Sequence, residues 1–506
     1  MKGIQKKSGV RLRGPSKTCE LTAWRVHLIN EDYHYSMRLP EIDVQVVARK
    51  LSEAIRHRTI SYPVGSDEAK LNESHHALVA FREWLSSAYP AFCAVAKREV
   101  VGEYSLLFTW QGSDTSLDPV LFLAHMDVVP VEPRTEPDWS HPPFAGAIAE
   151  DQVWGRGALD MKGALVTLLE AAERLIQDGH QPERTIHFAF GHDEENGGLE
   201  GSRRIAELLA SRGVRLFFSG DEGGGLAGPI FPGVAKDIAV IGVAEKGLLV
   251  VEVSTRGEGG HASAPLPFKR LAIGKLFTIL KRLGRLRFRN VMDLPTQRML
   301  EALGPESGPV LRLLIRYIRW TRPFLQQLLG RIPASSALFH TTLAHTVVCC
   351  GEKENVLPQR ARAVLNLRLH FVDTVLGVFE RILRVVGSEA EVRVVEPSRE
   401  ASTVSNMDGE AYHLLKTTIE QANPGTLVVP YLVSACTDSV YFQALTDSVL
   451  RFTPLPIGPG EQSLIHGTNE RVGIPQLGAA VTFYMRLIMT AGRLSSTDTV
   501  MAQLGR

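Results

Sequence analysis

Apolar residues follow two patterns in the first half of the chain. Continuous apolar runs at residues 118–126 and 186–191 predict short buried strands, and a hairpin is predicted over residues 96–110. Apolar residues spaced three or four apart predict helices over residues 40–57, 72–87, 163–176 and 202–212. Strands that alternate with helices build a sheet covered on both faces, so we expect an α/β fold with a mostly parallel central sheet.

The pattern changes after residue 246. Alternating strands are predicted over residues 248–255 and 361–369, with a helix over residues 269–283 between them. These elements indicate a smaller α+β module, residues 247–373, inserted into the first domain. Helices over residues 375–386 and 410–422 then return to the first domain, which comprises residues 40–246 and 374–490. Residues 1–39 and 491–506 are predicted to be tails.

One stretch of the insertion is strongly basic. Residues 284–331 hold three acids and nine arginines, namely Arg285, Arg287, Arg289, Arg298, Arg312, Arg316, Arg319, Arg322 and Arg331. Apolar residues such as Leu314 and Trp320 recur there at helical spacing. Two interpretations are open: a helix packed on the core with a solvated basic face, which we favour, or a helix that faces a partner or a membrane.

Composition narrows the class of protein. The 506 residues are 44% hydrophobic and 22% charged with a formal net charge of +1, which gives no reason to expect a nucleic acid partner. Five cysteines without a CxxC spacing favour a reducing, cytoplasmic location over a disulfide framework. The basic N-terminus lacks the apolar core of a secretory signal and is predicted to be disordered. No run of about 18 apolar residues predicts a membrane span.

Candidate chemistry lies at predicted strand ends. His125 and Asp127 follow the strand at 118–126, and their spacing of two puts both side chains on one side of an extended chain. A ligand imidazole commonly donates its other N–H to such a carboxylate. Alone, this pair is more often ordinary surface.

Four further stretches supply potential ligands. Asp160 lies in a glycine-rich turn, the pair Glu194 and Glu195 follows the strand at 186–191, Asp221 ends another apolar run, and His466 follows a Pro- and Gly-rich loop. Two histidines with three carboxylates form the donor set of a dinuclear metal site that suits zinc, cobalt or manganese. Glu194 is then left to act as a general base.

The order of these motifs resembles the co-catalytic zinc peptidases that include carboxypeptidase G, aminoacylase and succinyl-diaminopimelate desuccinylase. The motifs that carry the resemblance are AHMDVVP, GRGALDMKG, GHDEENGG, SGDEGG and HGTNE. The stretches GEKENVLPQRARAVLNLR and VVPYLVSACTDS resemble the branch of carboxypeptidase S and the N-fatty-acyl-amino-acid synthase/hydrolases. The family usually carries a small residue or Asn at Cys436 and often a basic residue at Val440, so substrate preference does not transfer directly.

The resemblance implies a zinc-peptidase catalytic domain with an inserted lid domain, through which a homodimer could form. It implies two Zn²⁺ per chain, with Asp160 as the bridge, and a cis peptide bond after that residue. The implied metal ligands are His125, Asp160, Glu195, Asp221 and His466. Asp127 would support His125, and Glu194 would be the base. Substrate would contact His261, Asn355 and Arg368.

The function implied is hydrolysis of an amide bond next to a free carboxylate, in a small peptide or an N-acyl amino acid. An aminopeptidase or dipeptidase of the same family is one alternative. It would need an acid for the substrate ammonium, whereas Arg368 offers the opposite charge. A non-catalytic binding protein on the same fold is the other, although every implied ligand and the base are present.

Overall fold

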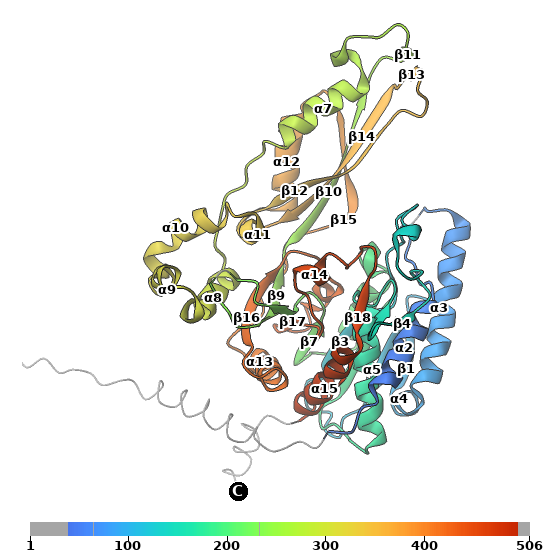
Figure 1. Ribbon diagram of the computed structural model, residues 1–506, viewed down its shortest axis with the longest axis vertical. Helices are drawn as coiled ribbons and strands as arrows, with labels where there is room; N and C mark the ends of the chain where they lie inside the picture. Colours follow the sequence, from blue (N-terminus) through green and yellow to red (C-terminus); the bar gives the residue numbers. More distant parts are fainter. Residues whose placement is uncertain (1–38, 64, 232, 494–506) are drawn as a thin grey trace, which may run out of the picture. The chain divides into compact units, whose positions relative to one another are not determined.

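The computed structural model describes residues 39–63, 65–231 and 233–493 (Figure 1). Of the tails predicted at residues 1–39 and 491–506, residues 1–38 and 494–506 lie outside these ranges. The largest sheet has nine strands in the order β1-β2-β6-β3-β7-β17-β9-β16, with β8 paired to β9. The strands are β1 Lys97–Val101, β2 Ser105–Trp110, β3 Val120–His125, β6 Ile186–Gly191, β7 Phe218–Asp221, β8 Gly225–Gly228, β9 Ile238–Glu245, β16 Leu427–Val433 and β17 Val449–Arg451.

This sheet is mixed. Strand β3 runs parallel to β6 and β7, β7 runs parallel to β17, and β16 runs parallel to β9. The pairs β1–β2, β2–β6, β8–β9 and β9–β17 are antiparallel. The α/β class is confirmed, but the sheet is less parallel than expected. For β1 and β2 the reason is the tight link between them, which is too short for the crossover that parallel strands need.

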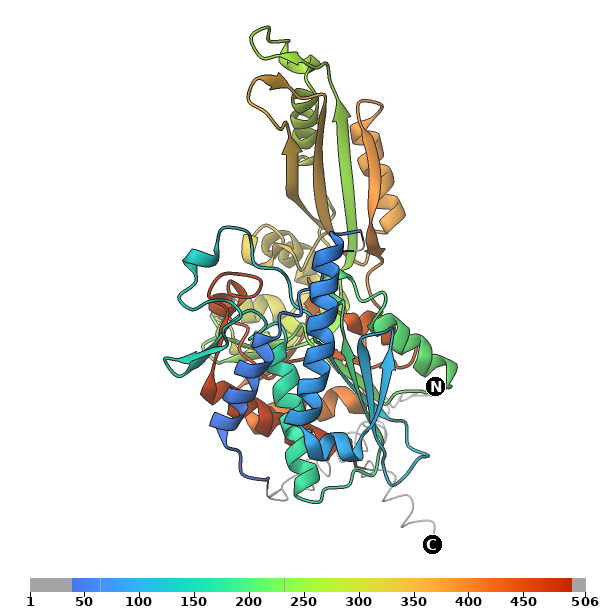
Figure 2. The same ribbon diagram turned by 90° about the vertical axis from the view of Figure 1, so that its right-hand side faces the viewer.

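Helices cover both faces of the large sheet. On β2, Leu107 packs with Ile205 of α6, whereas the neighbouring Phe108 packs against Phe92 of α4. Successive strand side chains point to opposite faces, so α4 and α6 lie on opposite sides of the sheet. Figure 2 shows α2, α3 and α5, coloured blue to teal, running side by side. The helices are α2 Val44–Arg56, α3 Glu68–Ala88, α4 Pro90–Val95, α5 Lys162–Gln177, α6 Ser202–Ser211, α13 Glu410–Ala422, α14 Pro459–Gln462 and α15 Ile474–Ala491.

A second sheet has four antiparallel strands in the order β12-β14-β10-β15. They are β10 Gly247–Arg256, β12 Thr342–Cys350, β14 Arg360–Leu369 and β15 Glu391–Arg399, and helices α7 Ala272–Leu283 and α12 Val375–Val386 pack on them. Strand β15 belongs to this sheet and α12 packs on it. The boundary predicted at residue 373 would therefore separate both elements from the sheet that they complete. We therefore propose that the inserted module extends to Arg399. A ribbon of β11 Gly260–His261 and β13 Val356–Leu357 adjoins it.

The basic stretch forms three helices that share a buried cluster with the large sheet. These are α8 Leu294–Leu303, α9 Pro309–Arg316 and α10 Ile318–Leu329, and the short helix α11 Pro333–Ser336 follows them. Leu300, Ile315 and Leu325 share one buried cluster with Val429 of β16. The two ends of the segment that contains these helices, residues 291–339, lie next to each other, because Val291 N donates to Phe339 O at 2.7 Å. The favoured interpretation, packing on the core, holds for one face of these helices.

The remaining elements are short. A three-stranded sheet joins β18 Arg471–Gly473, β5 Gln152–Trp154 and β4 Ala147–Ala149. The 3-10 helices are η1 Glu136–Asp138, η2 Glu194–Asn196, η3 Phe268–Arg270, η4 Gly304–Glu306 and η5 Asp438–Phe442. None of the helices within the described ranges combines the length and the apolar composition needed to cross a membrane.

Candidate metal centre

Asp160 lies between two imidazoles. Its Oδ1 is 2.9 Å from His125 Nε2, and its Oδ2 is 3.0 Å from His466 Nε2. His125 ends β3, whereas His466 lies in the turn that precedes β18. Each oxygen of one carboxylate therefore faces a different histidine, which is the arrangement needed to bridge two cations. The Asp160–Met161 peptide bond is cis, as the resemblance implies.

The acidic cluster after β6 forms η2 and turns both glutamates toward these groups. Glu195 Oε1 is 3.2 Å from His466 Nε2, and it is buried without a hydrogen-bond partner among the described residues. Ligand atoms of Glu194, Glu195 and His125 lie within 4.8 Å of one another. Asp127 supports the cluster from behind, since its two oxygens accept from the Glu194 and Glu195 amides, each at 3.2 Å.

Asp127 also fixes the His125 ring. His125 Nδ1 lies 2.9 Å from the Asp127 carbonyl oxygen and 3.5 Å from its carboxylate. A proton on Nδ1 leaves Nε2 free to face Asp160 as a lone-pair donor. The geometry of His125 and Asp127 is therefore the one expected of a metal ligand and its orienting group.

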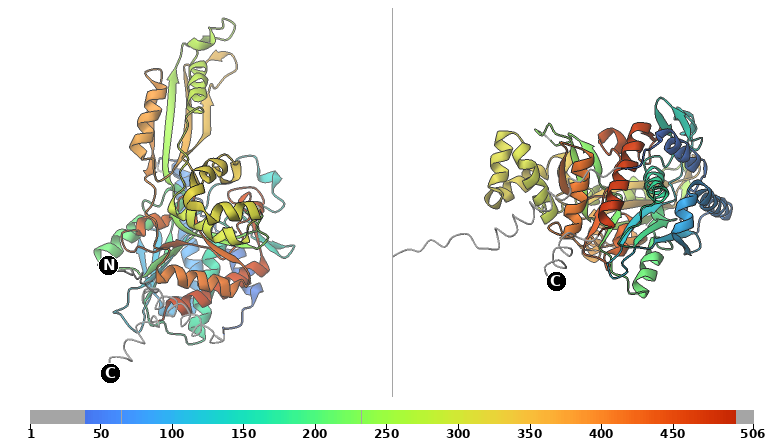
Figure 3. Two further views of the ribbon diagram at one scale, coloured as in Figure 1. Left: turned by 90° about the vertical axis from the view of Figure 1, so that its left-hand side faces the viewer. Right: turned by 90° about the horizontal axis from the view of Figure 1, so that it is seen from below.

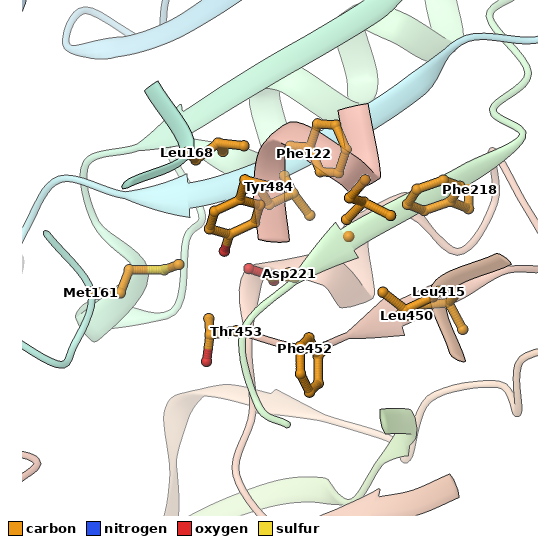
Figure 4. Close-up of a pocket in the computed structure, with 13 residues that line it drawn as sticks. Phe122, Met161, Leu168, Phe218, Asp221, Leu415, Leu450, Phe452, Thr453 and Tyr484 are labelled. Carbon is orange, nitrogen blue, oxygen red and sulfur yellow. The ribbon is translucent and has the colours of Figure 1, made fainter. Parts of the chain in front are cut away.

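Asp221 is the predicted ligand that the structure does not bring into the group. Its Oδ2 accepts from Ser439 N at 2.8 Å, and in Figure 4 its carboxylate faces the Tyr484 hydroxyl across a small core cavity. The next residue, Glu222, lies closer to the group, with Oε1 3.5 Å from His125 Nε2. Sequence analysis assigned Glu222 no role. Asp221 is the last residue of β7 and Glu222 follows it directly, so the direction of the backbone there decides which side chain faces His125.

The electrostatics of the cluster favour positive charge. The neighbouring carboxylates of Asp160 and Glu195 raise the pKa of His466 to about 10. Burial alone would raise the pKa of Asp160, but its bonds to the two imidazoles lower it below its ordinary value. Burial, followed by the neighbouring Asp160 charge, raises the pKa of Glu222 to about 8. So many carboxylates are held close together only where cations offset their repulsion.

Glu470 organises the loop that carries Asp160. Its Oε1 accepts from the amides of Gly157, Leu159 and Asp160 at 2.9–3.2 Å, and its Oε2 accepts from Arg156 Nη1 at 2.6 Å. Arg156 Nη2 also donates to the His466 carbonyl at 3.1 Å. Glu470 and Arg156 are buried and join the loop of Asp160 to the turn of His466. Sequence analysis quoted both motifs but gave neither residue a role.

A buried network also supports the loop after β16. Glu245 accepts from Thr437 Oγ1, from Ser439 Oγ and from Arg451 Nε. Ser439 N in turn donates to Asp221. All five side chains are at most 5% exposed. This chain of bonds fixes Asp221 from the core side.

The predicted substrate residues fall into two places. Arg368 on β14 donates from Nη1 to Cys436 Sγ at 3.1 Å, so it meets the loop after β16. His261 lies on β11 and Asn355 directly precedes β13, and Ala262 N donates to the Asn355 carbonyl at 3.0 Å. Both residues are exposed, and neither belongs to the metal-ligand group found among the described residues.

Residues 121–490 match peptidase family M20/M25/M40. A probable carboxypeptidase S-like 2 of Dictyostelium discoideum is 32% identical, covering 92% of this chain and 88% of the relative. The N-fatty-acyl-amino acid synthase/hydrolase PM20D1 of Mus musculus is 35% identical, covering 82% and 83%. Carboxypeptidase S of Saccharomyces cerevisiae is 29% identical, covering 87% and 83%.

Solved structures share the fold. An M20 family metallo-carboxypeptidase from Sulfolobus solfataricus superposes with a TM-score of 0.64 at 19% identity, covering 88% of this chain and 99% of that one. Human carnosine dipeptidase 1 superposes with a TM-score of 0.65 at 15% identity, covering 95% and 100%. Fold and site together define a metal-dependent hydrolase of amide bonds. The chain belongs to peptidase family M20/M25/M40.

Proposed function

We propose that this enzyme cleaves the amide bond next to a free carboxylate, with N-acyl amino acids or small peptides as substrates. The observation that carries the proposal is Asp160, with one oxygen toward His125 and the other toward His466, beside Glu194. The names of the relatives, carboxypeptidase S and N-fatty-acyl-amino acid synthase/hydrolase, support the substrate class.

The donor set suits two zinc ions. Ligand atoms around a tetrahedral zinc lie about 3.4 Å apart, since each is roughly 2.0–2.2 Å from the metal. The contacts at 2.9–3.5 Å fit that spacing, and the unpartnered Glu195 Oε1 is available for coordination. His125, Asp160, Glu195 and His466 would hold the ions, and the fifth contact would come from Glu222 or the predicted Asp221. When bound, the ions supply Lewis acidity toward the scissile carbonyl and lower the pKa of water.

Glu194 performs the proton transfers. Its ligand atom lies with those of His125 and Glu195, and burial raises the pKa of its carboxyl above the ordinary value. A carboxylate with a raised pKa is a stronger base, and it can take a proton from the attacking water and return it to the leaving amine. Asp127 keeps this residue and Glu195 in place through their backbone amides.

Arg368 would bind the substrate carboxylate. Its guanidinium is half-buried, and a thiol sulfur is a weak acceptor, so the bond to Cys436 leaves other N–H groups free for a planar carboxylate. His261 and Asn355 remain proposed substrate contacts.

The test compares N-acyl amino acids with their methyl esters. Arg368→Ala is expected to raise KM for the acids about tenfold to hundredfold, which is the usual effect of losing a hydrogen bond to a charged group, and to change KM for the esters little. Arg362→Ala is the matched control, because Arg362 lies on the same strand but pairs with Glu252. Equal losses on acid and ester would contradict the role of Arg368.

Metal content is the second test. Fully active protein should carry close to two divalent ions per chain, lose activity on chelation, and recover it with zinc, cobalt or manganese. One tightly held ion at full activity would contradict the dinuclear site. Cleavage that requires a free substrate amine and ignores the carboxylate would favour the aminopeptidase alternative.

Two expectations accompany this proposal. The four cysteines in the described ranges are free, which supports a reducing, cytoplasmic location. Strand β12 is the edge of the four-stranded sheet and most of its residues are exposed, which supports a homodimer formed through that sheet. Light scattering on the purified protein would test the dimer.

A further inference from the structure

Helices α9 and α10 leave large apolar side chains in solvent. Trp320 is 85% exposed and Val310 is 74% exposed. The exposed apolar side chains of this segment are Val310, Leu313, Tyr317, Trp320, Phe324 and Leu328. They recur every three or four residues, which is the spacing of one helix face, and Tyr317 lies at the junction of the two helices. Figure 3 shows α9 and α10 as adjacent helices, coloured yellow, beside the rest of the insertion.

This exposed face is not the one that holds the helices to the protein. The residues that pack on the large sheet are Ile315, Ile318, Leu325 and Leu329, each at most 9% exposed. The buried positions lie between the exposed ones in the sequence, so they point to a different side of each helix. The helices therefore have a second apolar face, and core packing explains only the first. A contiguous apolar surface of this kind usually marks a binding site.

The charge of the segment is uniformly positive. Between Glu306 and Glu352 the sequence contains no acid. Five arginines lie in this stretch, and all are exposed, namely Arg312, Arg316, Arg319, Arg322 and Arg331. Arg312 and Arg322 donate to the carbonyls of Ser307 and Met292, whereas no such bond engages Arg316 and Arg319 among the described residues. Trp320, Tyr317 and Phe324 are side chains that favour the boundary between lipid and water, and arginine can keep its charge in the headgroups while its stem lies along apolar surface.

We propose that the α9–α10 surface docks on the face of an anionic lipid bilayer. The helices would lie in the interface with Trp320 and Phe324 inserted and the arginines among the headgroups. The inference goes beyond the proposed function and does not depend on it, because neither helix contributes a residue to the metal-ligand group.

Charge argues against the other occupants. A second copy docked through the same face would bring two sets of arginines together without an intervening acid. The N-terminal sequence would repel the surface as well, because six basic residues precede its first acid, Glu20. An anionic bilayer supplies both an apolar layer and the opposite charge.

The experiment measures co-sedimentation of the full-length protein with vesicles of phosphatidylcholine alone and of phosphatidylcholine with 30% phosphatidylglycerol. Wild-type protein should bind the anionic vesicles at least about tenfold more tightly, and 0.5 M salt should weaken that binding because it screens the attraction. Trp320→Ser with Phe324→Ser should reduce binding at least about tenfold. Arg316→Gln with Arg319→Gln should remove the preference for phosphatidylglycerol.

The matched control is Phe268→Ser with Leu376→Ser, which removes apolar side chains that are 56% and 66% exposed outside α9 and α10. It should bind as wild type does. The proposal is overturned if wild type binds neither vesicle at low salt, if it binds both equally, or if Trp320→Ser with Phe324→Ser leaves binding intact. It is also overturned if that double variant converts a dimer to a monomer in light scattering, which would assign the face to a second copy.

Discussion

Arg156 Nη1 donates to Glu470 Oε2 at 2.6 Å and joins two segments 314 residues apart in the sequence. The pair is buried, and Glu470 also accepts from the amides of the loop that ends at Asp160. Neither side chain faces the metal-ligand group. Their bonds hold the Asp160 loop and the His466 turn in fixed positions relative to each other.

Glu470→Gln is expected to weaken metal binding about tenfold to hundredfold, the usual cost of losing an outer-shell partner. The amide keeps the size of the side chain but loses its charge and can accept at only one oxygen, so both the Arg156 bond and the loop amides lose stabilisation. Competition with a chromophoric chelator measures the metal affinity. Glu420→Gln, at an exposed glutamate of α13, is the control, and equal affinities in both variants would show that Glu470 has no positioning role.

Glu194→Gln should keep both metals and lose turnover by about three orders of magnitude, because it removes the proton acceptor and leaves coordination intact. Glu195→Gln should lose metal first, since Glu195 Oε1 is free to coordinate. Elemental analysis and single-turnover rates on both variants distinguish the roles. Equal metal contents in the two variants would contradict this division.

Substitution of Asp221 or Glu222 tests which of the two acids contributes to metal binding. Glu222 lies 3.5 Å from His125, whereas Asp221 is held by Ser439 N, so Glu222→Gln is expected to lower metal content more than Asp221→Asn. Metal titration of both variants measures the difference. The reverse result would assign the ligand role to Asp221, as the sequence predicts.

His187 should make stability depend on acid pH. Burial, followed by the charge of Arg212, lowers the pKa of His187 to about 4, and Thr109 Oγ1 lies 3.0 Å from its Nδ1. The unfolded chain therefore binds this proton more readily than the folded chain. The free energy of unfolding is unaffected by His187 above about pH 6.5 and should fall by up to about 3 kcal/mol as the pH drops from 6.5 to 4.

Urea denaturation at several pH values measures this slope. His187→Gln should flatten it between pH 6.5 and 4, whereas His413→Gln, at an exposed position of α13, should leave it unchanged. An unchanged slope in His187→Gln would show that other groups cause the acid sensitivity. Metal-free protein should be used throughout, so that metal release does not contribute.

Periodicity predicted the regular elements well where packing and local signals agree. Strand β6 and helices α12 and α13 begin and end at the predicted residues. Helix α3 begins four residues earlier than predicted, because Asp67 caps it by accepting from Ala69 N. The pairing of β15 with β10 could not be predicted, because strand pairing depends on contacts between residues far apart in the sequence, here Glu252 and Arg393.

In the site, too, features with a local sequence signal were predicted and features set by distant contacts were not. The sequence predicted the cluster of His125, Asp160, Glu195 and His466, because each follows a recognisable strand end or glycine-rich turn. It predicted Asp221 and gave no role to Glu222, because the direction in which adjacent acids point is not visible in the sequence. Arg156 and Glu470 were missed because their role is a contact between two distant loops.

The hydrogen bond between Val291 N and Phe339 O also bears on how this chain could have diverged from its relatives. A segment whose two ends meet can be lengthened, shortened or replaced while the neighbouring chain keeps its path, which is why insertions are tolerated at such points. Helices α8 to α11 fall inside that closed segment, and all the metal-ligand candidates fall outside it. Natural selection could therefore change where the enzyme resides without altering the chemistry it performs.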